Sequence, residues 1–208
     1  FFGAIAAALP LLLLVAAIRL MRAPREEEQH GGRAVGLSGK DGRLLQARKL
    51  HLYRPQEKDK PPELIDLGMV GEVESVQPEI ILSLQAGRFI PIIAPVGVGE
   101  QGETYNINAD LVAGKVAAAL HAAKLILITD VPGVLDDTGR LISSMDMERA
   151  ESLVRDGVIK GGMLPKVQCA LDAVHRGVEK AHIIDGRKEH ALLLEIFTTT
   201  GIGTQIVR

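Results

Sequence analysis

Short β-rich apolar runs alternate with segments of helical periodicity from residue 30 to the end of the chain. The clearest run, Lys124–Thr129, is apolar enough to form a strand that is buried on both faces. Asp146–Asp156 carries apolar residues at helical spacing and is followed by Gly157, a residue type that commonly ends helices. Strands that alternate with helices predict an α/β domain around a mostly parallel sheet.

The other expected elements follow the same two periodicities and are separated by glycine or proline. We expect further strands at residues 33–37, 71–76, 89–96, 182–185 and 205–207, and further helices at residues 78–87, 108–120, 165–176 and 189–197. We also expect hairpins near residues 44–52 and around residues 136–139, and a polar surface loop over residues 54–62.

The composition excludes several classes of protein. Hydrophobic residues make up 47% of the 208 residues and charged residues 24%, which excludes a disordered chain, a fibrous repeat and a disulfide scaffold. The formal net charge is -2 and no basic motif is present, so we expect no nucleic-acid partner. The single cysteine, Cys169, fits a reducing, cytoplasmic compartment. The six histidines show no close pair beside a carboxylate, so we expect no metal site in the protein.

Residues 1–29 differ in residue composition from the rest of the chain. Residues 1–18 carry no charge, contain Pro10 and are followed by several arginines and a run of glutamates. They read as a membrane anchor, a buried helix or an upstream stretch that does not belong to the domain, and we prefer the third reading. If they span a membrane, the positive-inside rule places the remainder in the cytoplasm. The domain itself is expected to comprise residues 30–208.

Two segments resemble nucleotide-binding fingerprints, but one lacks the structural context and the other lacks part of the motif. Gly97–Gly102 matches G-x-G-x-x-G and follows an expected strand, but no helix opens at its last glycine. We therefore interpret it as a glycine-rich mobile loop. Gly114-Lys115 lacks the earlier glycine and the Ser or Thr of a P-loop. Both standard fingerprints are rejected.

Asn108 can cap the helix expected after it, which places Asp110 in the first turn and Asn106 just before the helix. A carboxylate in the first turn is favoured by the helix dipole whether or not it has a function. This motif alone therefore favours a structural role for Asp110.

Lys166 points toward a function. Pro165 suits the first helical position, which would put Lys166 in the first turn after Gly161 and Gly162. A cation there opposes the helix dipole at a cost of about 0.3–1 kcal/mol, and a bound phosphate would offset that cost. The alternative is a lysine that extends into water. Asp130 directly follows the strand Lys124–Thr129, and ligands of open α/β sheets bind at the carboxyl ends of strands.

Four segments together resemble a known family. They are residues 31–42 (GGRAVGLSGKDG), 106–110 (NINAD), 129–133 (TDVPG) and 161–166 (GGMLPK). In this order they resemble the acetylglutamate kinases, a branch of the amino-acid kinase family. Residues 190–204 (HALLLEIFTTTGIGT) resemble the ending of the arginine-inhibited members. The resemblance runs from about residue 29 to residue 208 and implies a three-layer αβα sandwich, of which this chain holds mainly the nucleotide-binding part.

The resemblance implies an ATP- and Mg²⁺-dependent kinase that phosphorylates the γ-carboxylate of N-acetyl-L-glutamate in arginine biosynthesis. By motif match, Lys166 would stabilise charge on the transferred phosphoryl group, Asp110 would orient the catalytic lysines, and Asn106 would bind acetylglutamate. The residues expected to line the nucleotide are Asp130, Val131, Gly133, Leu135, Val158, Lys160 and Gly162.

Arginine is a possible feedback inhibitor under the same resemblance. His190 and Glu195 are its candidate contacts, because a carboxylate can pair a guanidinium through two hydrogen bonds. The alternative for Glu195 is an exposed residue of a helix.

Members of the family begin with a lobe that carries a second catalytic lysine, a glycine-rich substrate loop and a substrate-binding arginine. Nothing in residues 1–28 resembles that lobe or its dimer surface. We therefore expect the polypeptide as written to be inactive or nearly so. The resemblance implies a homo-oligomer but leaves the assembly of this chain open.

Two other functions compete with the acetylglutamate kinase. A kinase for another acid, such as aspartate or glutamate, is disfavoured by residues 106–110 and by the ending 190–204. A membrane-tethered, non-catalytic nucleotide-binding or regulatory module would explain the apolar residues 1–18.

Overall fold

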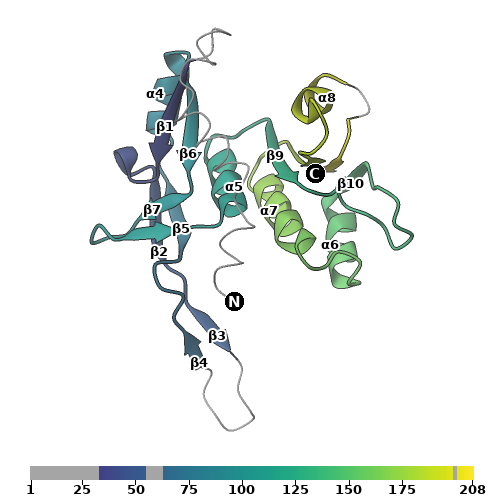
Figure 1. The fold of residues 1–208 in the computed structure, drawn as a ribbon, viewed down its shortest axis with the longest axis horizontal. Coiled ribbons are helices and arrows are strands. Elements are labelled where there is room, and N and C mark those ends of the chain that lie inside the picture. Colours follow the sequence, from purple (N-terminus) through teal and green to yellow (C-terminus); the bar gives the residue numbers. More distant parts are fainter. Residues whose placement is uncertain (1–32, 55–62, 199–200) are drawn as a thin grey trace. The chain divides into compact units, whose positions relative to one another are not determined.

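The computed structural model describes residues 33–54, 63–198 and 201–208 (Figure 1). The chain divides into two compact units, residues 1–112 and residues 113–208. Residues 1–29, and with them the three readings of the apolar segment, lie outside the described residues, as does nearly all of the loop expected at 54–62. Within the described ranges, no helix is both long enough and apolar enough to span a membrane.

Among its described residues, the first unit contains three small sheets and one complete α-helix. Its strands are β1 (Ala34–Ser38), β2 (Leu45–Lys49), β3 (Leu52–Arg54), β4 (Glu63–Ile65), β5 (Gly71–Val76), β6 (Ile90–Ala94), β7 (Val96–Val98) and β8 (Thr104–Asn106), its helix is α4 (Glu79–Ala86), and a 3₁₀ turn lies at Asp41–Arg43. Strands β1 and β6 pair in parallel, β3 and β4 form an antiparallel pair, and the third sheet has the order β5-β2-β7-β8. Helix α5 (Ala109–Ala119) crosses the boundary between the units.

The hairpin expected near residues 44–52 is wrong. Strand β2 pairs antiparallel with β5 and parallel with β7, so it lies inside a sheet. The physical reason is burial: Leu45 and Ala47 point to the core, and a strand with a buried face gains most from partners on both sides. The strand expected at 89–96 is divided, because β6 ends at Ala94 and β7 begins after Pro95, whose nitrogen cannot donate a ladder hydrogen bond.

The glycine-rich segment 97–102 belongs to the hairpin between β7 and β8. The Gly99 N–H donates to the Glu103 carbonyl at 2.9 Å, and Gly102 has a φ of +91°, which favours glycine. No helix follows the last glycine, since β8 begins at Thr104. The rejection of a dinucleotide fingerprint is confirmed.

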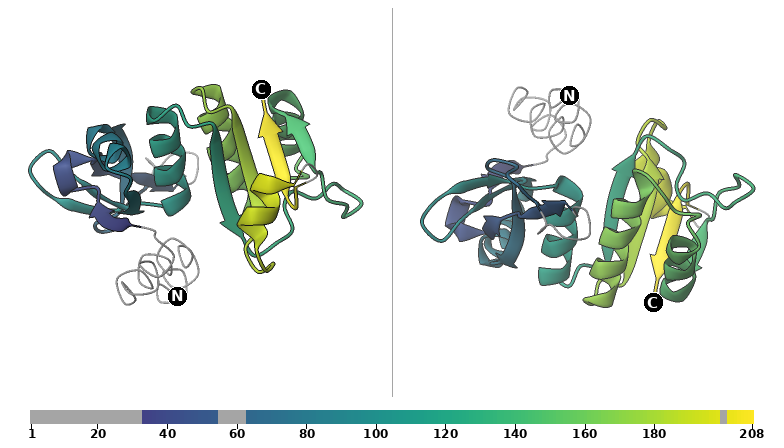
Figure 2. Two further views of the ribbon diagram at one scale, coloured as in Figure 1. Left: turned by 90° about the horizontal axis from the view of Figure 1, so that it is seen from above. Right: turned by 90° about the horizontal axis from the view of Figure 1, so that it is seen from below.

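The second unit is a mixed sheet with helices on both faces (Figure 2). Its strands are β9 (Lys124–Thr129), β10 (Ser144–Asp146), β11 (Lys180–Asp185) and β12 (Thr204–Val207), and its helices are α6 (Met147–Arg155), α7 (Met163–His175) and α8 (Ala191–Phe197). The sheet order is β10-β12-β11-β9, in which β9–β11 and β10–β12 are parallel and only β11–β12 is antiparallel. The expected α/β class is confirmed, and in this unit the sheet is mostly parallel, as expected from the alternation.

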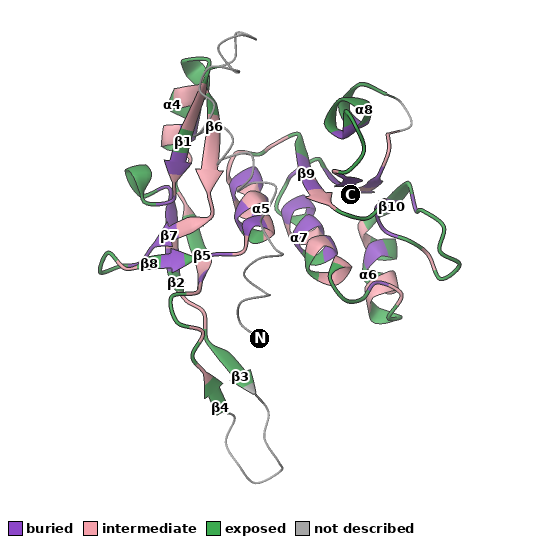
Figure 3. Cartoon of the chain, in the orientation of Figure 1, coloured by how far each residue is buried: buried purple, intermediate pink, exposed green. Residues whose placement is uncertain are grey.

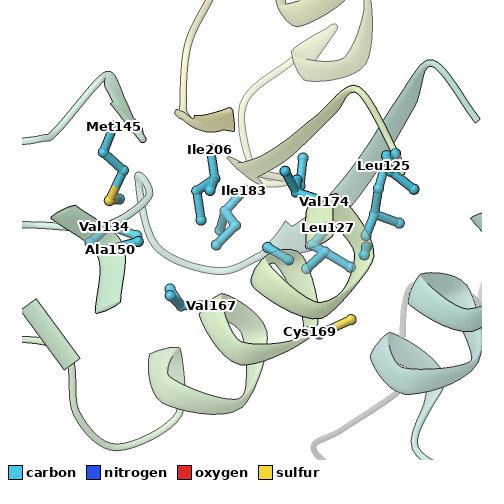
Figure 4. Close-up of a cluster of buried hydrophobic side chains, with 14 of the residues drawn as sticks. Leu125, Leu127, Val134, Met145, Ala150, Val167, Cys169, Val174, Ile183 and Ile206 are labelled. Carbon is cyan, nitrogen blue, oxygen red and sulfur yellow. The ribbon is translucent and has the colours of Figure 1, made fainter. Parts of the chain in front are cut away.

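The core of this unit fixes which helix covers which face of the sheet. Figure 4 shows Leu125 and Leu127 of β9 and Ile183 of β11 packed with Val167 and Val174 of α7. Because side chains alternate along a strand, the intervening residues of β9 and β11 face away from α7. Figure 3 colours several positions of α7 as buried, and Val167, Ala170 and Val174 among them recur at helical spacing on one face. Helix α7 therefore packs against β9 and β11 through one shared hydrophobic core, which fixes its position on the sheet.

Several local predictions hold in this unit. Ala150 of α6 is fully buried and the other apolar residues of that helix pack against the same cluster. Cys169 is buried in the core, as expected for a small core residue. The small hairpin around 136–139 is present, with Leu135 bridged to Leu141 and the Asp136 N–H donating to the Arg140 carbonyl.

Candidate functional site

The carboxyl ends of β9 and β11 meet at one edge of the second sheet. The two strands run parallel and in register up to the pair Thr129–Asp185. Beyond this pair, the Gly186 N–H donates to the Thr129 carbonyl at 2.9 Å, so the turn after β11 is attached to the end of β9. This is the edge at which ligands of open α/β sheets bind.

Lys166 reaches this edge from helix α7. Its Nζ lies 3.5 Å from the carbonyl oxygen of Ile128, the residue before the end of β9, and the side chain is half-buried. Helix α7 begins at Met163, so Pro165 is its third residue and the prediction of a first position is wrong by two residues. Proline is tolerated there because the first N–H groups of a helix have no intrahelical acceptor. Lys166 is consequently the fourth helical residue, at the end of the first turn.

The loop before α7 leaves room next to Lys166. Gly161 has a φ of +59°, a backbone conformation that L side chains rarely adopt, and a Cβ at Gly161 or at Gly162 would meet no atom within 4 Å. Val158 is half-buried and Lys160 is exposed in the same loop. The start of α7 is thus open to a ligand.

The segment after β9 supplies the other predicted nucleotide residues. Asp130 is exposed and accepts from the Thr129 hydroxyl at 3.4 Å. Val131 and Leu135 are exposed apolar side chains. Gly133 has a φ of +145°, and a Cβ there would lie 2.6 Å from Oγ1 of Thr204, which fixes the path of this loop against β12. All seven residues predicted to line a nucleotide therefore belong to the second unit, as does Lys166.

Asn106 and Asp110 belong to the first unit. The capping role of Asn108 is confirmed, since its Oδ1 accepts from the N–H groups of Asp110 at 2.9 Å and Leu111 at 3.2 Å. Asn106 is the exposed last residue of β8, and Asp110 is the half-buried second residue of α5. The structure places these two residues on either side of the helix cap.

Lys40 contacts the strand that carries Asn106 and was missed by the sequence reasoning. Its Nζ donates to Oγ1 of Thr104 at 3.0 Å. Thr104 and Asn106 alternate with the buried Tyr105, so they lie on the same face of β8. The signal was available, because Lys40 stands inside the family-like segment 31–42, but nothing local indicated which strand it would contact.

Glu195 is buried on the face of the sheet opposite to α7. Its Oε1 lies 2.6 Å from Nδ1 of His182, and its Oε2 accepts from the N–H groups of Ile202 at 2.7 Å and Gly203 at 3.3 Å. Glu195 is only 7% exposed and His182 only 4%, so the reading of Glu195 as an exposed helix residue is wrong. His182 was missed by the sequence reasoning because it is the third residue of a buried strand. His190, the other arginine candidate, is exposed and precedes α8 with a φ of +56°.

Burial and hydrogen bonding act in opposite directions on Glu195. Burial by itself raises the pKa of Glu195, but hydrogen bonds from the Ile202 N–H and from His182 outweigh it and hold the pKa below its ordinary value. The charged carboxylate is therefore the stable form at neutral pH.

Comparisons with known proteins agree with this architecture. Relatives named acetylglutamate kinase include that of Syntrophobacter fumaroxidans, 64% identical over 180 residues, and that of Geobacter sulfurreducens, 61% identical over 180 residues. Each alignment covers 86% of this chain, but only 60% and 61% of the respective relative, so the chain spans about three fifths of their length.

Solved structures with a similar fold include an N-acetylglutamate synthase from Neisseria gonorrhoeae complexed with coenzyme A and L-arginine. It has a TM-score of 0.69 and 25% identity, and the match covers 85% of this chain and 38% of the synthase. Carbamate kinase from Giardia lamblia bound to AMP-PNP has a TM-score of 0.63, covers 92% of this chain and 72% of the kinase, and at 14% identity shows the fold alone.

The fold and the open helix start at the carboxyl edge define an α/β protein with a ligand-accessible sheet edge. Residues 26–185 match the model of the amino acid kinase family. The chain belongs to the amino acid kinase family. The membrane-tethered alternative rests on residues 1–18, which lie outside the described residues, and the relatives give it no support.

Proposed function

We propose that this chain carries the nucleotide-binding part of an N-acetyl-L-glutamate kinase, which transfers the γ-phosphoryl group of ATP to the γ-carboxylate of N-acetyl-L-glutamate. The observation that carries the proposal is the approach of Lys166 from the open start of α7 to the carboxyl edge of β9. The relatives at 57–64% identity that bear the name acetylglutamate kinase support the choice of substrate.

Phosphoryl transfer requires positioning and positive charge more than covalent participation by the protein. In this proposal the ammonium of Lys166 stabilises the charge that develops on the transferred phosphoryl group. The adjacent glycines allow phosphate oxygens to approach the backbone N–H groups at the start of α7. The apolar side chains of Val131 and Leu135 flank the nucleotide, together with Asp130, Gly133, Val158, Lys160 and Gly162.

Mg²⁺ enters with the nucleotide in this proposal. Magnesium prefers oxygen ligands and usually binds through one or two carboxylates plus the phosphates of the substrate. The exposed carboxylate of Asp130 at the sheet edge fits that preference. When bound, the ion neutralises charge on the phosphate oxygens, while Lys166 and the helix start hold them in place.

The acceptor side of the proposal rests on the first unit. The side-chain amide of Asn106 is assigned to acetylglutamate, and Asp110 is assigned to orient the lysines that act on the phosphoryl group. Both are carried over from the family-like segment NINAD. Lys40 adds a cation on the same face of β8 as Asn106, where a dicarboxylic substrate would benefit from it.

Regulation by arginine is proposed for the region of α8, with His190 and Glu195 as contacts. The synthase structure complexed with L-arginine supports a search for arginine binding in a protein of this fold. Because Oε2 of Glu195 already accepts two backbone hydrogen bonds, a guanidinium can pair with both oxygens of this carboxylate only if it displaces one of them. A homo-oligomer and a cytoplasmic location, the latter suggested by the single buried Cys169, are part of the same proposal.

The acceptor is tested by trapping the acyl phosphate. The chain is incubated with ATP, Mg²⁺ and hydroxylamine, and the hydroxamate formed from acetylglutamate is compared with that formed from glutamate or aspartate. We expect slow formation with acetylglutamate, because Asn106 and Lys40 alone are assigned to the acceptor in this chain. We expect the product to disappear in Lys166→Ala. Hydroxamate from aspartate or glutamate in preference to acetylglutamate would refute the proposed substrate.

A further inference from the structure

An ion pair at the candidate nucleotide edge has no role in the function proposed so far. Asp185 is the last residue of β11, and its side chain is only 6% exposed, whereas that of Arg187 is 66% exposed. The guanidinium donates two parallel hydrogen bonds to the carboxylate, from Nε to Oδ1 at 3.0 Å and from Nη2 to Oδ2 at 2.9 Å. The Arg187 N–H also donates to Oδ1 at 3.0 Å. The two guanidinium hydrogen bonds fix the direction of the Arg187 side chain, and the backbone bond holds the turn against Asp185.

Arg187 and Lys166 are anchored to the same few residues of the sheet. Asp185 pairs with Thr129 at the end of the two parallel strands, and Lys166 contacts the carbonyl of Ile128, one residue earlier. By alternation along β11, the side chain of Asp185 points to the same face as that of Ile183, which packs against α7. Helix α7 carries Lys166 in its first turn. Two cations are therefore anchored at one edge of the second unit.

The charged groups around Arg187 leave one excess positive charge at this edge. The Arg187 guanidinium lowers the pKa of Asp185 to about 2, so the pair stays ionised at neutral pH. The hydrogen bonds to Asp185 raise the pKa of Arg187, and the charge of Asp130, one of the predicted nucleotide residues, adds to this effect. The three cations Arg187, Lys188 and Lys166 outnumber these two carboxylates by one, which favours an anionic ligand.

A purely structural role explains this pair poorly. An ion pair whose guanidinium is exposed contributes little to stability, because solvent screens it. A guanidinium has five N–H donors in a rigid planar fork, and the carboxylate uses only one side of that fork. Phosphate oxygens fit the geometry of the donors that remain.

We propose that Arg187, held in position by Asp185, binds the phosphate groups of the nucleotide beside Lys166. The ligand chemistry is that of a nucleoside di- or triphosphate, and the inference rests on the proposed function, in which this edge binds ATP. Asp185 acts as a positioning residue. The base and the ribose contribute nothing to this contact, so the role of Arg187 scales with the number of phosphates.

The test is calorimetric titration of the 208-residue chain with Mg-ATP, Mg-ADP, AMP and adenosine. A charge-assisted hydrogen bond predicts that Arg187→Ala weakens ATP and ADP binding about ten- to a hundred-fold and leaves adenosine unchanged. Asp185→Asn keeps the charge of Arg187 but loosens its position, and it is expected to weaken ATP binding by a smaller factor. The matched control is Arg155→Ala, which removes an arginine of the same unit that is 68% exposed and paired with Glu151.

Each outcome distinguishes this inference from the proposed function. A wild-type chain that binds ATP, together with an Arg187→Ala variant that binds it equally well, overturns the inference alone. An equal loss of ATP and adenosine binding in Arg187→Ala also overturns it, because the residue would then support the fold and not the phosphates. If Arg187→Ala does not fold, Arg187→Lys decides, since the ammonium keeps the charge and loses the fork: unchanged preference for ATP over adenosine contradicts the proposal. A folded wild-type chain that binds no ATP refutes the proposed function itself.

Discussion

Replacement of Glu195 by alanine lowers the free energy of unfolding of the second unit by at least about 3 kcal/mol at pH 7. The carboxylate connects three segments: helix α8, the strand residue His182, and the turn that contains Ile202 and Gly203. Its removal leaves a buried imidazole nitrogen and two backbone N–H groups without their acceptor. Urea unfolding followed by circular dichroism measures the effect.

The Glu195→Gln variant and the pH dependence of the stability difference are the controls for this prediction. Glutamine keeps an oxygen for the two backbone N–H groups, so we expect a smaller loss than with alanine. A carboxyl group whose folded pKa is depressed stabilises the fold above its unfolded pKa of about 4.3, and this contribution is lost as the pH falls through the lower folded pKa. The difference between wild type and Glu195→Ala should therefore narrow in acid. A constant difference from pH 7 to pH 3 would contradict the assigned role of the charge.

Gly203→Ala is expected to destabilise the second unit by about 3 kcal/mol, near the upper end of ordinary overpacking effects. A Cβ at Gly203 would lie 2.2 Å from the carbonyl oxygen of Ile183 and 2.8 Å from Cγ2 of Ile184. Both atoms belong to β11, which pairs with β12 directly after the glycine. Neither atom is the end of a flexible side chain in open space, so β12 must move away from the sheet. The shift in the urea midpoint measures the cost.

Gly162→Ala serves as the matched control for this substitution. Gly162 has an ordinary helical φ of −66°, and a Cβ there would meet no atom within 4 Å. We expect a change in the free energy of unfolding within about 0.5 kcal/mol. Equal destabilisation by the two substitutions would mean that the close approach at Gly203 does not determine the cost.

Local signals in the sequence were sufficient for many elements of the fold. Strand β5 and strand β9 have the predicted boundaries, because each is a run of residues typical of strands with a clear change of residue type at its ends. The start of α5 follows from the capping side chain of Asn108, whose acceptor bonds involve residues only two and three positions away. The position of Lys166 near a carboxyl edge of the sheet could be predicted because a glycine loop precedes its helix and a buried strand, β9, ends in a polar turn.

Features that depend on distant partners could not be predicted in this way. The partners of β2 are decided by burial of Leu45 and Ala47 against strands that follow much later in the chain. For Glu195 the sequence left an arginine contact and an exposed helix residue as alternatives, because its partner His182 lies on another element. Asp185-Gly186-Arg187 resembles a simple surface turn in sequence, and only the parallel register of β9 and β11 brings it to the edge that Lys166 reaches.

Titration of the folded chain with Mg-ATP, compared with Lys166→Ala, tests the central claim most directly. The account predicts saturable binding of Mg-ATP by the wild-type chain and an affinity about ten- to a hundred-fold lower in Lys166→Ala, while adenosine binds both alike. A folded wild-type chain that binds no ATP, or a Lys166→Ala variant with unchanged affinity for ATP, would contradict the assignment of this edge to the phosphates of a nucleotide.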